Sequence, residues 1–342
     1  MELAGRTLGE LASRLKVSDL KTKRFPWKTL LQIAAVLMVA AALVIALPKI
    51  DFAALKQSLM TLDPLHSTLA LMGVSMLWVG RCLLLGRLMN LRVPFPFAKA
   101  LSVGLMGGFM DQVIPARGGM VFRWALIHKT TKASKSFVFS ALMTAFVLEG
   151  IGLLILFLGV VAFDESASQF SSPGLIVVFI LSIVVLLLLI PFSNLILRRI
   201  RGTFIEKLRP LVSLLEIASI ARNPWKFCEW TLIVAMMWIG NIWAAYELAS
   251  AFSMTLSISQ LILMLFVINV AILIPAVPGN LGTMQLAITW VLVRFGILSS
   301  TAVAYSLVFH AIHVVPILIL GAIVLVRHTA KGAKAVPSQI GP

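Results

Sequence analysis

Charged residues are scarce in this sequence. Only 12% of its 342 residues are Asp, Glu, Lys or Arg, whereas 60% are hydrophobic and the mean hydropathy is +1.02. A soluble chain carries roughly twice that charged fraction. The apolar residues also come in runs long enough for spanning helices, which need about 20 of them and satisfy their own backbone polar groups. The composition therefore excludes a soluble protein and predicts an all-α polytopic membrane protein.

Acidic residues and cysteines are scarcer still. The chain has 13 acidic against 29 basic residues and a net charge of +16. We expect no nucleic-acid partner, because the basic residues are sorted among separate loops. The two cysteines, Cys82 and Cys228, lie far apart without the spacing of metal ligands. Both fall near predicted cytoplasmic helix ends, so neither a disulfide nor a metal site is expected.

The apolar runs predict about six transmembrane helices. A basic cytoplasmic tail (residues 1–27) precedes a single transmembrane domain (28–326), and a second cytoplasmic tail (327–342) follows. The first run fills a membrane and follows a long basic tail, which indicates an uncleaved signal anchor rather than a signal peptide. The predicted spans are residues 28–47, 65–88, 136–162, 174–197, 229–250 and 301–326.

Two further apolar segments, residues 98–128 and 258–298, are each interrupted by proline and glycine. Basic loops stay in the cytoplasm, and a full crossing by residues 98–128 would put basic loops on opposite sides. We therefore expect re-entrant hairpins, the first opening to the cytoplasm and the second to the outside. Both termini are then cytoplasmic. We expect the protein to lie in the inner membrane of the cell. The basic residues lie mainly in the two tails and in residues 87–99, 129–135 and 198–226.

Two short motifs recur at one offset of 160 residues. Met-Leu-Trp-Val-Gly-Arg at 76–81 matches Met-Met-Trp-Ile-Gly-Asn at 236–241, and Ile-Pro-Ala occurs at 114–116 and again at 274–276. The shared offset predicts an internal repeat, and the charge rule orients its two units in opposite directions. Inverted repeats with interrupted helices are typical of secondary transporters. The predicted units are about residues 65–162 and 225–326.

The tip of the first hairpin carries residue types that hold an anion. Proline ends one half-helix and glycine lets backbone approach a ligand. A half-helix that starts after the tip aims free N–H groups at an anion, and arginine grips phosphate at two points. One reading is a phosphate or lipid head-group site; the other is an Asp111–Arg117 pair that merely closes the hairpin. The candidate binding residues are Arg117, Gly118, Gly119 and Arg123.

The tip of the second hairpin has the same helix breakers but no charge. Asn280, Thr283 and Gln285 could bind a polar group, and they could equally cap the returning helix. Both alternatives stay open. The candidate substrate-binding residues at this tip are Pro278, Gly279, Asn280, Gly282 and Gln285.

Glu149 lies near the middle of a predicted span, where a charge costs about 3 kcal/mol on insertion scales. It can be a proton carrier, a salt-bridge partner of Arg117 or Arg123, or a protonated packing residue. Two histidines near its repeat position could relay protons or be structural. We expect Arg81 to extend toward the cytoplasmic interface rather than reach the hairpin. The candidates for proton coupling or buried charge are Glu149, His310, His313 and Asp111.

These residues also resemble a known family. Residues 115–119, Glu149, Pro275 and residues 278–282 are similar to the flippase region of lysylphosphatidylglycerol synthases and its stand-alone relatives, over about residues 30–326. The resemblance implies the family's fold, and lipid handling with transbilayer movement of a polar lipid as the activity. It does not carry over the head-group preference. Met120, Gly150 and Gln285 stand where the family often has Glu, Arg and Glu.

Three classes of function follow. A flippase-like transporter that moves or binds a polar lipid, anionic or lipid-linked, is favoured by the opposed hairpins and the cationic tip. The alternatives are a non-catalytic scaffold for lipid-biosynthesis enzymes and an intramembrane lipid-modifying enzyme. The sequence has no HExxH, GxSG, GxGD or Walker motif. We therefore expect no enzyme activity, cofactor or metal, and membrane lipids as the main partners.

Overall fold

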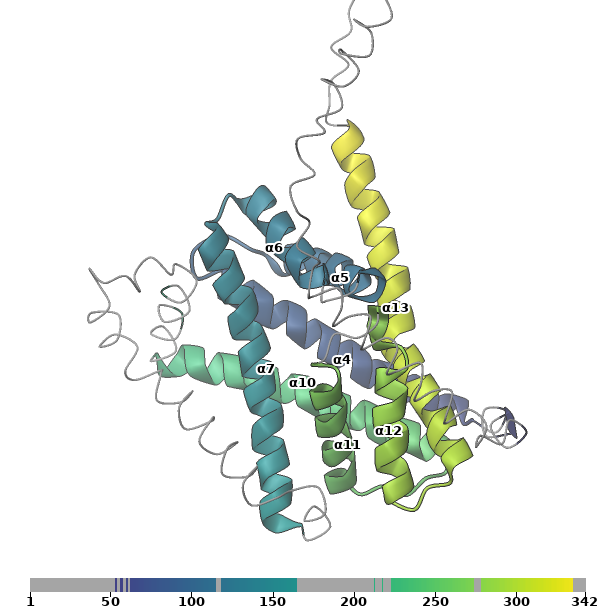
Figure 1. The fold of residues 1–342 in the computed structure, drawn as a ribbon. Helices are drawn as coiled ribbons and strands as arrows, with labels where there is room; N and C mark the ends of the chain where they lie inside the picture. The colour runs from purple at the N-terminus through teal and green to yellow at the C-terminus, as the bar shows by residue number, and fades with distance from the viewer. Residues whose placement is uncertain are drawn as a thin grey trace, which may run out of the picture.

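A computed structural model describes residues 62–114, 118–164, 223–273 and 278–334, together with the single positions 53, 56, 57, 60, 212 and 217. All regular structure in these ranges is helical (Figure 1). The elements are α4 (Pro64–Met89), α5 (Phe97–Val113), α6 (Gly118–Thr131), α7 (Lys135–Phe163), α10 (Pro224–Ala251), α11 (Ile258–Ala271), the 3-10 helix η5 (Pro278–Asn280), α12 (Thr283–Arg294) and α13 (Ser299–Lys334).

Four of these helices, α4, α7, α10 and α13, are long and apolar enough to cross a membrane. They coincide within a few residues with the spans predicted at 65–88, 136–162, 229–250 and 301–326. The prediction of an all-α polytopic membrane protein is thus confirmed. The spans predicted at 28–47 and 174–197 lie outside the described residues, as do the N-terminal tail and most of the C-terminal tail.

Each predicted broken segment consists of two helices with an interruption between them. In the first, α5 ends at Val113, and Ile114 adopts an extended conformation (φ −102°, ψ 123°). Ile114 precedes Pro115, whose ring excludes the helical conformation from the residue before it. In the second, Gly279, Asn280 and Gly282 have φ of 65°, 56° and 81°. This left-handed backbone requires glycine, or tolerates asparagine, and it separates α11 from α12.

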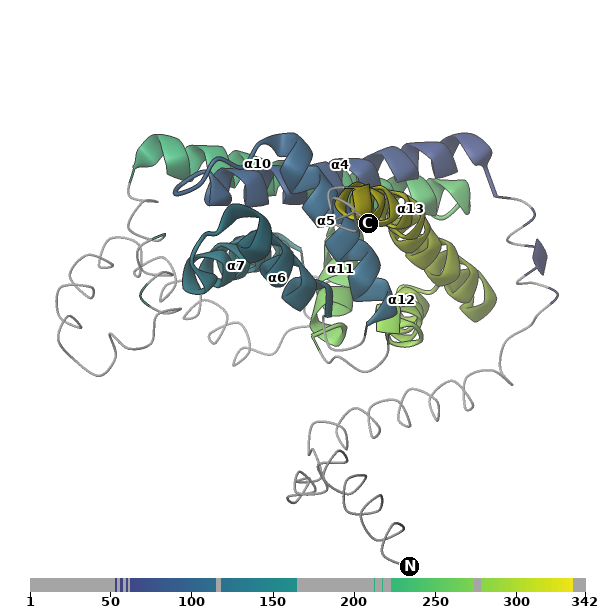
Figure 2. The ribbon, with the colours of Figure 1, turned by 90° about the horizontal axis from the view of Figure 1, so that it is seen from above.

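The most extensive helix contact joins α4 and α10, which lie side by side along one face of the molecule (Figure 2). A Cβ atom on Gly73 would lie 2.5 Å from the backbone oxygen of Gly240, so glycine is what allows this approach. Cβ atoms on Gly80 and Gly240 would meet Met236 and Met76 respectively. Met76 and Met236 are 160 residues apart, and so are Gly80 and Gly240. The repeated motifs therefore pack against each other reciprocally.

The two helices of this pair also have the same kind of N-terminal cap, and charged side chains connect them near both ends. Asp63 caps α4 ahead of Pro64, and Asn223 caps α10 ahead of Pro224, again at an offset of 160 residues. At one end, His66 Nδ1 lies 2.6 Å from Glu247 Oε2. At the other end, Arg87 Nε lies 2.9 Å from Glu229 Oε1, with the Arg87 side chain 52% exposed. Charged side chains thus connect the two helices on either side of the glycine crossing.

The remaining helices pack on one side of the α4–α10 layer, with α7 and α13 flanking the rest (Figure 2). Helices α5 and α6 lie in the upper half of Figure 1, and α11 and α12 lie in the lower half. The interruptions of the two segments meet between them. A Cβ atom on Gly279, in η5, would lie 3.0 Å from Gln112 Oε1 near the end of α5. The fold therefore brings together the two tips that the sequence singled out.

Candidate functional site

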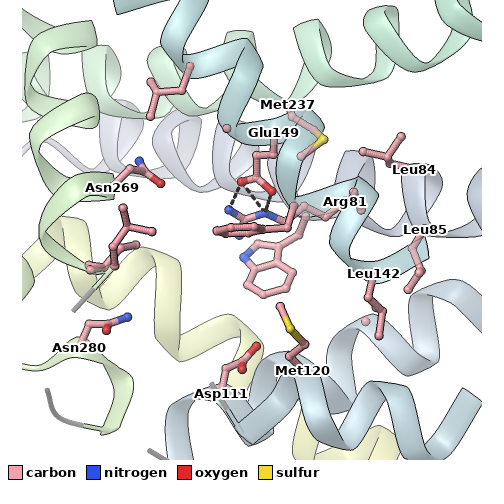
Figure 3. Close-up of a pocket in the computed structure, with 18 of the residues that line it drawn as sticks. Arg81, Leu84, Leu85, Asp111, Met120, Leu142, Glu149, Met237, Asn269 and Asn280 are labelled. Atoms are coloured by element: carbon pink, nitrogen blue, oxygen red, sulfur yellow. Dashed lines mark hydrogen bonds and ion pairs between the residues drawn. The ribbon is translucent and has the colours of Figure 1, made fainter. Parts of the chain in front are cut away.

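A cavity of about 500 Å³ lies where the two tips meet. Side chains from α4, α5, α6, α7, α10 and α11 line it, and residues 279–280 of the second tip complete it. Most of its wall is apolar, with Leu, Met, Phe and Trp side chains facing the space. Polar groups project into it from several elements (Figure 3). They include Arg81, Asp111, Arg123, Glu149, Asn269 and Asn280.

One ion pair forms the centre of the cavity wall. Arg81 Nε lies 3.0 Å and 3.1 Å from the two carboxylate oxygens of Glu149, and Arg81 Nη2 also contacts Oε1. The Arg81 guanidinium lies 5.2 Å from the ring centroid of Trp78, and Trp238 Nε1 donates to the Glu149 carbonyl oxygen over 3.0 Å. Arg81 therefore does not simply extend to the interface as expected. A carboxylate on another helix holds it at the cavity.

A second ion pair joins the two helices of the first broken segment. Arg123 Nη2 on α6 donates to Asp111 Oδ2 on α5 over 2.8 Å. Gly119 permits this approach of α6 to α5, because a Cβ there would collide with the Gly107 carbonyl and Asp111 itself. Arg123 is thus the partner of Asp111 and not of Glu149. The expected Asp111–Arg117 pair is untested, because Arg117 lies outside the described residues.

Among the described residues that line the cavity, positive and negative side chains are equal in number. Two guanidinium groups face two carboxylates, so these four residues give the wall no net charge. The side chain of Arg81 nevertheless remains 36% exposed, against 16% for Glu149. Two further polar atoms of lining residues, Trp78 Nε1 and Gln112 Oε1, are buried and have no hydrogen-bond partner within the described ranges. The wall thus offers both signs of charge.

The second tip combines capping with contact to the cavity. Asn280 and Gly279 line the cavity, and Pro278 begins η5. Gln285 Oε1 accepts from the Gly282 N–H over 2.8 Å, which caps α12. The Gln285 amide nitrogen lies 2.7 Å from His310 Nδ1. Gln285 therefore both caps the returning helix and binds a polar group, although that group is a histidine of α13 within this chain.

His313 lies one helical turn beyond His310. Its Nε2 lies 3.0 Å from Asn241 Oδ1 on α10, and its Nδ1 lies 2.8 Å from the Phe309 carbonyl oxygen. The cavity-lining residues do not include His310 or His313. Within the described parts of the chain, no three His, Cys, Asp or Glu side chains come close enough to hold a metal ion.

A family model described as the lysylphosphatidylglycerol synthase TM region matches residues 32–321. The chain belongs to this family. Membership links this membrane protein to lipid handling, and it agrees with the resemblance inferred from the tip residues and Glu149. A comparison with curated proteins finds no match.

Sequence reasoning about this family member overlooked the partner of Glu149. Arg81 was available as a signal, because it is a cation inside an apolar span and a buried carboxylate calls for one. Its partner, however, lies 68 residues away on another helix. The spacing of residues along one helix cannot identify such a contact, and only the packing of α4 against α7 brings the two side chains together.

Proposed function

We propose that this protein moves a polar lipid across the inner membrane, with the head group passing through the cavity beside the Arg81–Glu149 pair. Charged side chains inside a spanning domain are costly and usually line a substrate path. Here they face an open cavity instead of packed protein. The position of the two ion pairs on that cavity is the observation that carries the proposal, and membership of a lipid-handling family supports it.

The proposed transport domain is an inverted repeat of two units, about residues 65–162 and 225–326, with both termini in the cytoplasm. The reciprocal contacts of Met76 with Gly240 and of Met236 with Gly80 support this arrangement, because a twofold axis between α4 and α10 would exchange them. In the proposal, the broken segments are re-entrant hairpins that enter from opposite sides. The head group would then meet both tips midway, and rearrangement of one unit against the other would alternate access.

The balanced wall favours a head group that carries both signs of charge over a purely anionic one. A phosphate would bind Arg81 or Arg123, and a cationic group would bind Glu149 or Asp111. A purely anionic head group would gain from the guanidinium groups but meet repulsion from both carboxylates. The acyl chains would stay in the lipid, so the cavity of about 500 Å³ needs to admit the head group alone.

The test uses the purified full-length protein in liposomes that contain phospholipids labelled on an acyl chain, one with a phosphoglycerol and one with a phosphoethanolamine head group. A membrane-impermeant quencher reports how fast lipids of the inner leaflet reach the outer leaflet. The wild type should accelerate this exchange over empty liposomes. Glu149→Gln should slow it at least about tenfold, because a hydrogen bond to a charged group contributes about 1.5–3 kcal/mol.

Glu229→Gln is the matched control. Glu229 also pairs with an arginine of α4, Arg87, but it does not line the cavity. It should leave the exchange rate unchanged. A wild-type protein that moves neither lipid faster than empty liposomes would contradict the transport proposal and favour the scaffold. Conversion of the labelled lipid to a new species, detected by mass spectrometry, would instead favour the intramembrane enzyme.

A further inference from the structure

The second unit has a counterpart of the Arg81–Glu149 pair. Arg81 corresponds to Asn241 at the motif offset of 160 residues. Helix α7 begins at residue 135 and α13 at residue 299, an offset of 164, because the segments between the motif and these helices differ in length in the two units. At that offset Glu149 corresponds to His313. The observed partners are Arg81 with Glu149 and Asn241 with His313, so equivalent positions pair in both units.

The two pairs differ in whether their charge can change. Arginine remains charged in proteins, and Glu149 meets it at hydrogen-bonding distance, so the first pair is a standing ion pair. Asparagine has no charge, and histidine gains one only when it binds a proton. The second pair is therefore uncharged or singly positive. The difference between these two states is one proton on His313.

The hydrogen bonds of His313 suit both states. The Phe309 carbonyl oxygen can only accept, so His313 Nδ1 carries a hydrogen in either state. Nε2 faces the side-chain amide of Asn241, which presents an oxygen in one orientation and an NH2 group in the other, at nearly the same shape. The oxygen accepts from the imidazolium, and the NH2 group donates to the neutral ring. The Phe309 ring, with its centroid 4.3 Å from that of His313, can also face a cation favourably.

His310 lacks this freedom. Gln285 Oε1 is held by the Gly282 N–H, so the Gln285 NH2 group must donate to His310 Nδ1. That nitrogen is then an acceptor and carries no hydrogen. Protonating it would turn the Gln285 amide and break the cap of α12. The hydrogen bonds thus single out His313, rather than His310, as the group that can gain and lose a proton in place.

The surroundings connect this group to the cavity. Arg81 on α4 and His310 on α13 act on His313 electrostatically, while α10 contributes the uncharged Asn241 and α12 contributes Gln285 against His310. Asp111 on α5 acts in turn on Arg81. A proton on His313 therefore adds a positive charge that the guanidinium of Arg81 repels, so protonation of His313 and the position of Arg81 influence each other. Occupancy of one site must change the affinity of the other by the same factor.

We propose that His313 and Asn241 form a reversible proton-binding site that is coupled to the head-group site at Arg81 and Glu149. On binding, His313 Nε2 takes a proton from hydronium and leaves water, and Asn241 turns its oxygen toward the new N–H. On release, the steps reverse. Proton binding itself is independent of lipid transport, whereas its coupling role rests on the proposed function.

The first test observes the proton directly. The full-length protein with isotope-labelled histidine side chains is placed in lipid nanodiscs, and nitrogen NMR signals are followed between about pH 3 and pH 8, because burial, Arg81 and His310 all oppose a proton on His313. His313→Gln identifies the signals of His313 among the five histidines. These signals should change from imidazolium to neutral imidazole within the range, while those of His310 stay neutral. A His313 ring that remains neutral throughout overturns the proposal.

A second variant guards against misfolding of His313→Gln. Asn241→Asp places a carboxylate beside His313 Nε2 and should hold the imidazolium across the whole range, as in the standing pair of the first unit. Asn241→Asp with unaltered His313 titration would overturn the proposed pairing. Glu229→Gln, on the same helix as Asn241 but paired with Arg87, is the control and should leave the His313 titration within the range.

The coupling is tested in liposomes with an imposed pH gradient. Lipid exchange by the wild type should change severalfold with the gradient, and His313→Gln and Asn241→Asp should abolish this response. Exchange that ignores the gradient in the wild type overturns the coupling and leaves the transport proposal standing. Normal titration of His313 in a protein that moves no lipid would overturn the proposed function and the coupling together, but not the proton site.

Discussion

Arg81 on α4 binds Glu149 on α7 through its Nε, which lies within 3.1 Å of both carboxylate oxygens. The two side chains come from helices that are separated in sequence by α5 and α6. This contact therefore depends on the correct placement of everything between them. It also sets the polar wall of a cavity that is otherwise mostly apolar.

The Arg81–Glu149 pair should contribute more to stability than an exposed pair on the same helix. Arg81→Gln and Glu149→Gln should each destabilise the protein by about 1–3 kcal/mol, less than for a fully buried pair because Arg81 is 36% exposed. The double variant should recover part of the loss, since both partners are then neutral. The measurement is unfolding in mixed detergent micelles. A double variant whose loss in free energy of unfolding equals the sum of the two single losses would contradict the pairing.

The matched control for that cycle is the pair of Arg87 and Glu229. The Arg87 side chain is 52% exposed, and exposed pairs contribute about 0–1 kcal/mol. Arg87→Gln and Glu229→Gln should therefore change the free energy of unfolding little, singly or together. An equal loss at both pairs would show that charge removal in general, rather than the cavity pair, destabilises the protein.

The α4–α10 crossing should tolerate no side chain at its closest point. Gly73→Ala places a Cβ 2.5 Å from the Gly240 backbone oxygen and 2.8 Å from the Ala244 nitrogen, and backbone atoms can move only if the helices separate. We expect a loss of about 1–3 kcal/mol. Gly159→Ala in α7 is the control, because its Cβ would meet nothing within 4 Å. That variant should be neutral or slightly stabilising, since alanine favours helix.

The balance of charges in the cavity should set the head-group preference. Asp111→Asn leaves Arg123 without its carboxylate and gives the wall a net positive charge, so the lipids that co-purify should shift severalfold toward phosphoglycerol head groups. Arg123→Gln should shift them the other way. Lipid mass spectrometry of the purified variants gives the ratio, with Glu229→Gln as the reference. Identical lipid profiles in both variants would place the head group elsewhere.

The proposed inverted repeat makes a prediction about the side of the membrane on which each loop lies. Ser134 precedes α7 and Leu298 precedes α13 at the equivalent position, and both side chains are exposed. In a protein whose two native cysteines are replaced by serine, Ser134→Cys should react with a membrane-impermeant thiol reagent only from the cytoplasm. Leu298→Cys should react only from outside. Labelling of both from one side would refute the opposed orientation of the units.

The sequence was sufficient to predict the spanning helices that the structure describes. Long apolar runs demand backbone hydrogen bonds within each segment, so the limits of α4 and α7 follow from composition and from caps such as Asp63 and Ser134. The interruption at Pro115 was equally accessible, because proline restricts Ile114 whatever surrounds it. The re-entrant course of the two broken segments stays a prediction.

The partners of the polar residues were beyond the reach of the sequence. Glu149, Asp111 and His313 could each be recognised as costly inside a membrane, but the sequence left two candidate arginines for Glu149, suggested Arg117 for Asp111 and gave no partner for His313. Helix packing decides which partner comes within about 3 Å, and α4 is apolar around most of its circumference, so periodicity does not reveal which side faces α7. Arg81 and Asn241 became informative only when their partners on α7 and α13 were known.

The close contact of Gly73 with Gly240 has a consequence for how the protein is made. Helix α4 enters the membrane before α10, but the surface that α4 buries most closely belongs to α10, which the ribosome produces on the order of ten seconds later at ordinary rates of synthesis. In the interval, the exposed glycine backbone of α4 and the side chain of Arg81 must remain in contact with lipid, α7 or the insertion machinery. Newly made chains that end before α10 are therefore the form most exposed to cellular quality control.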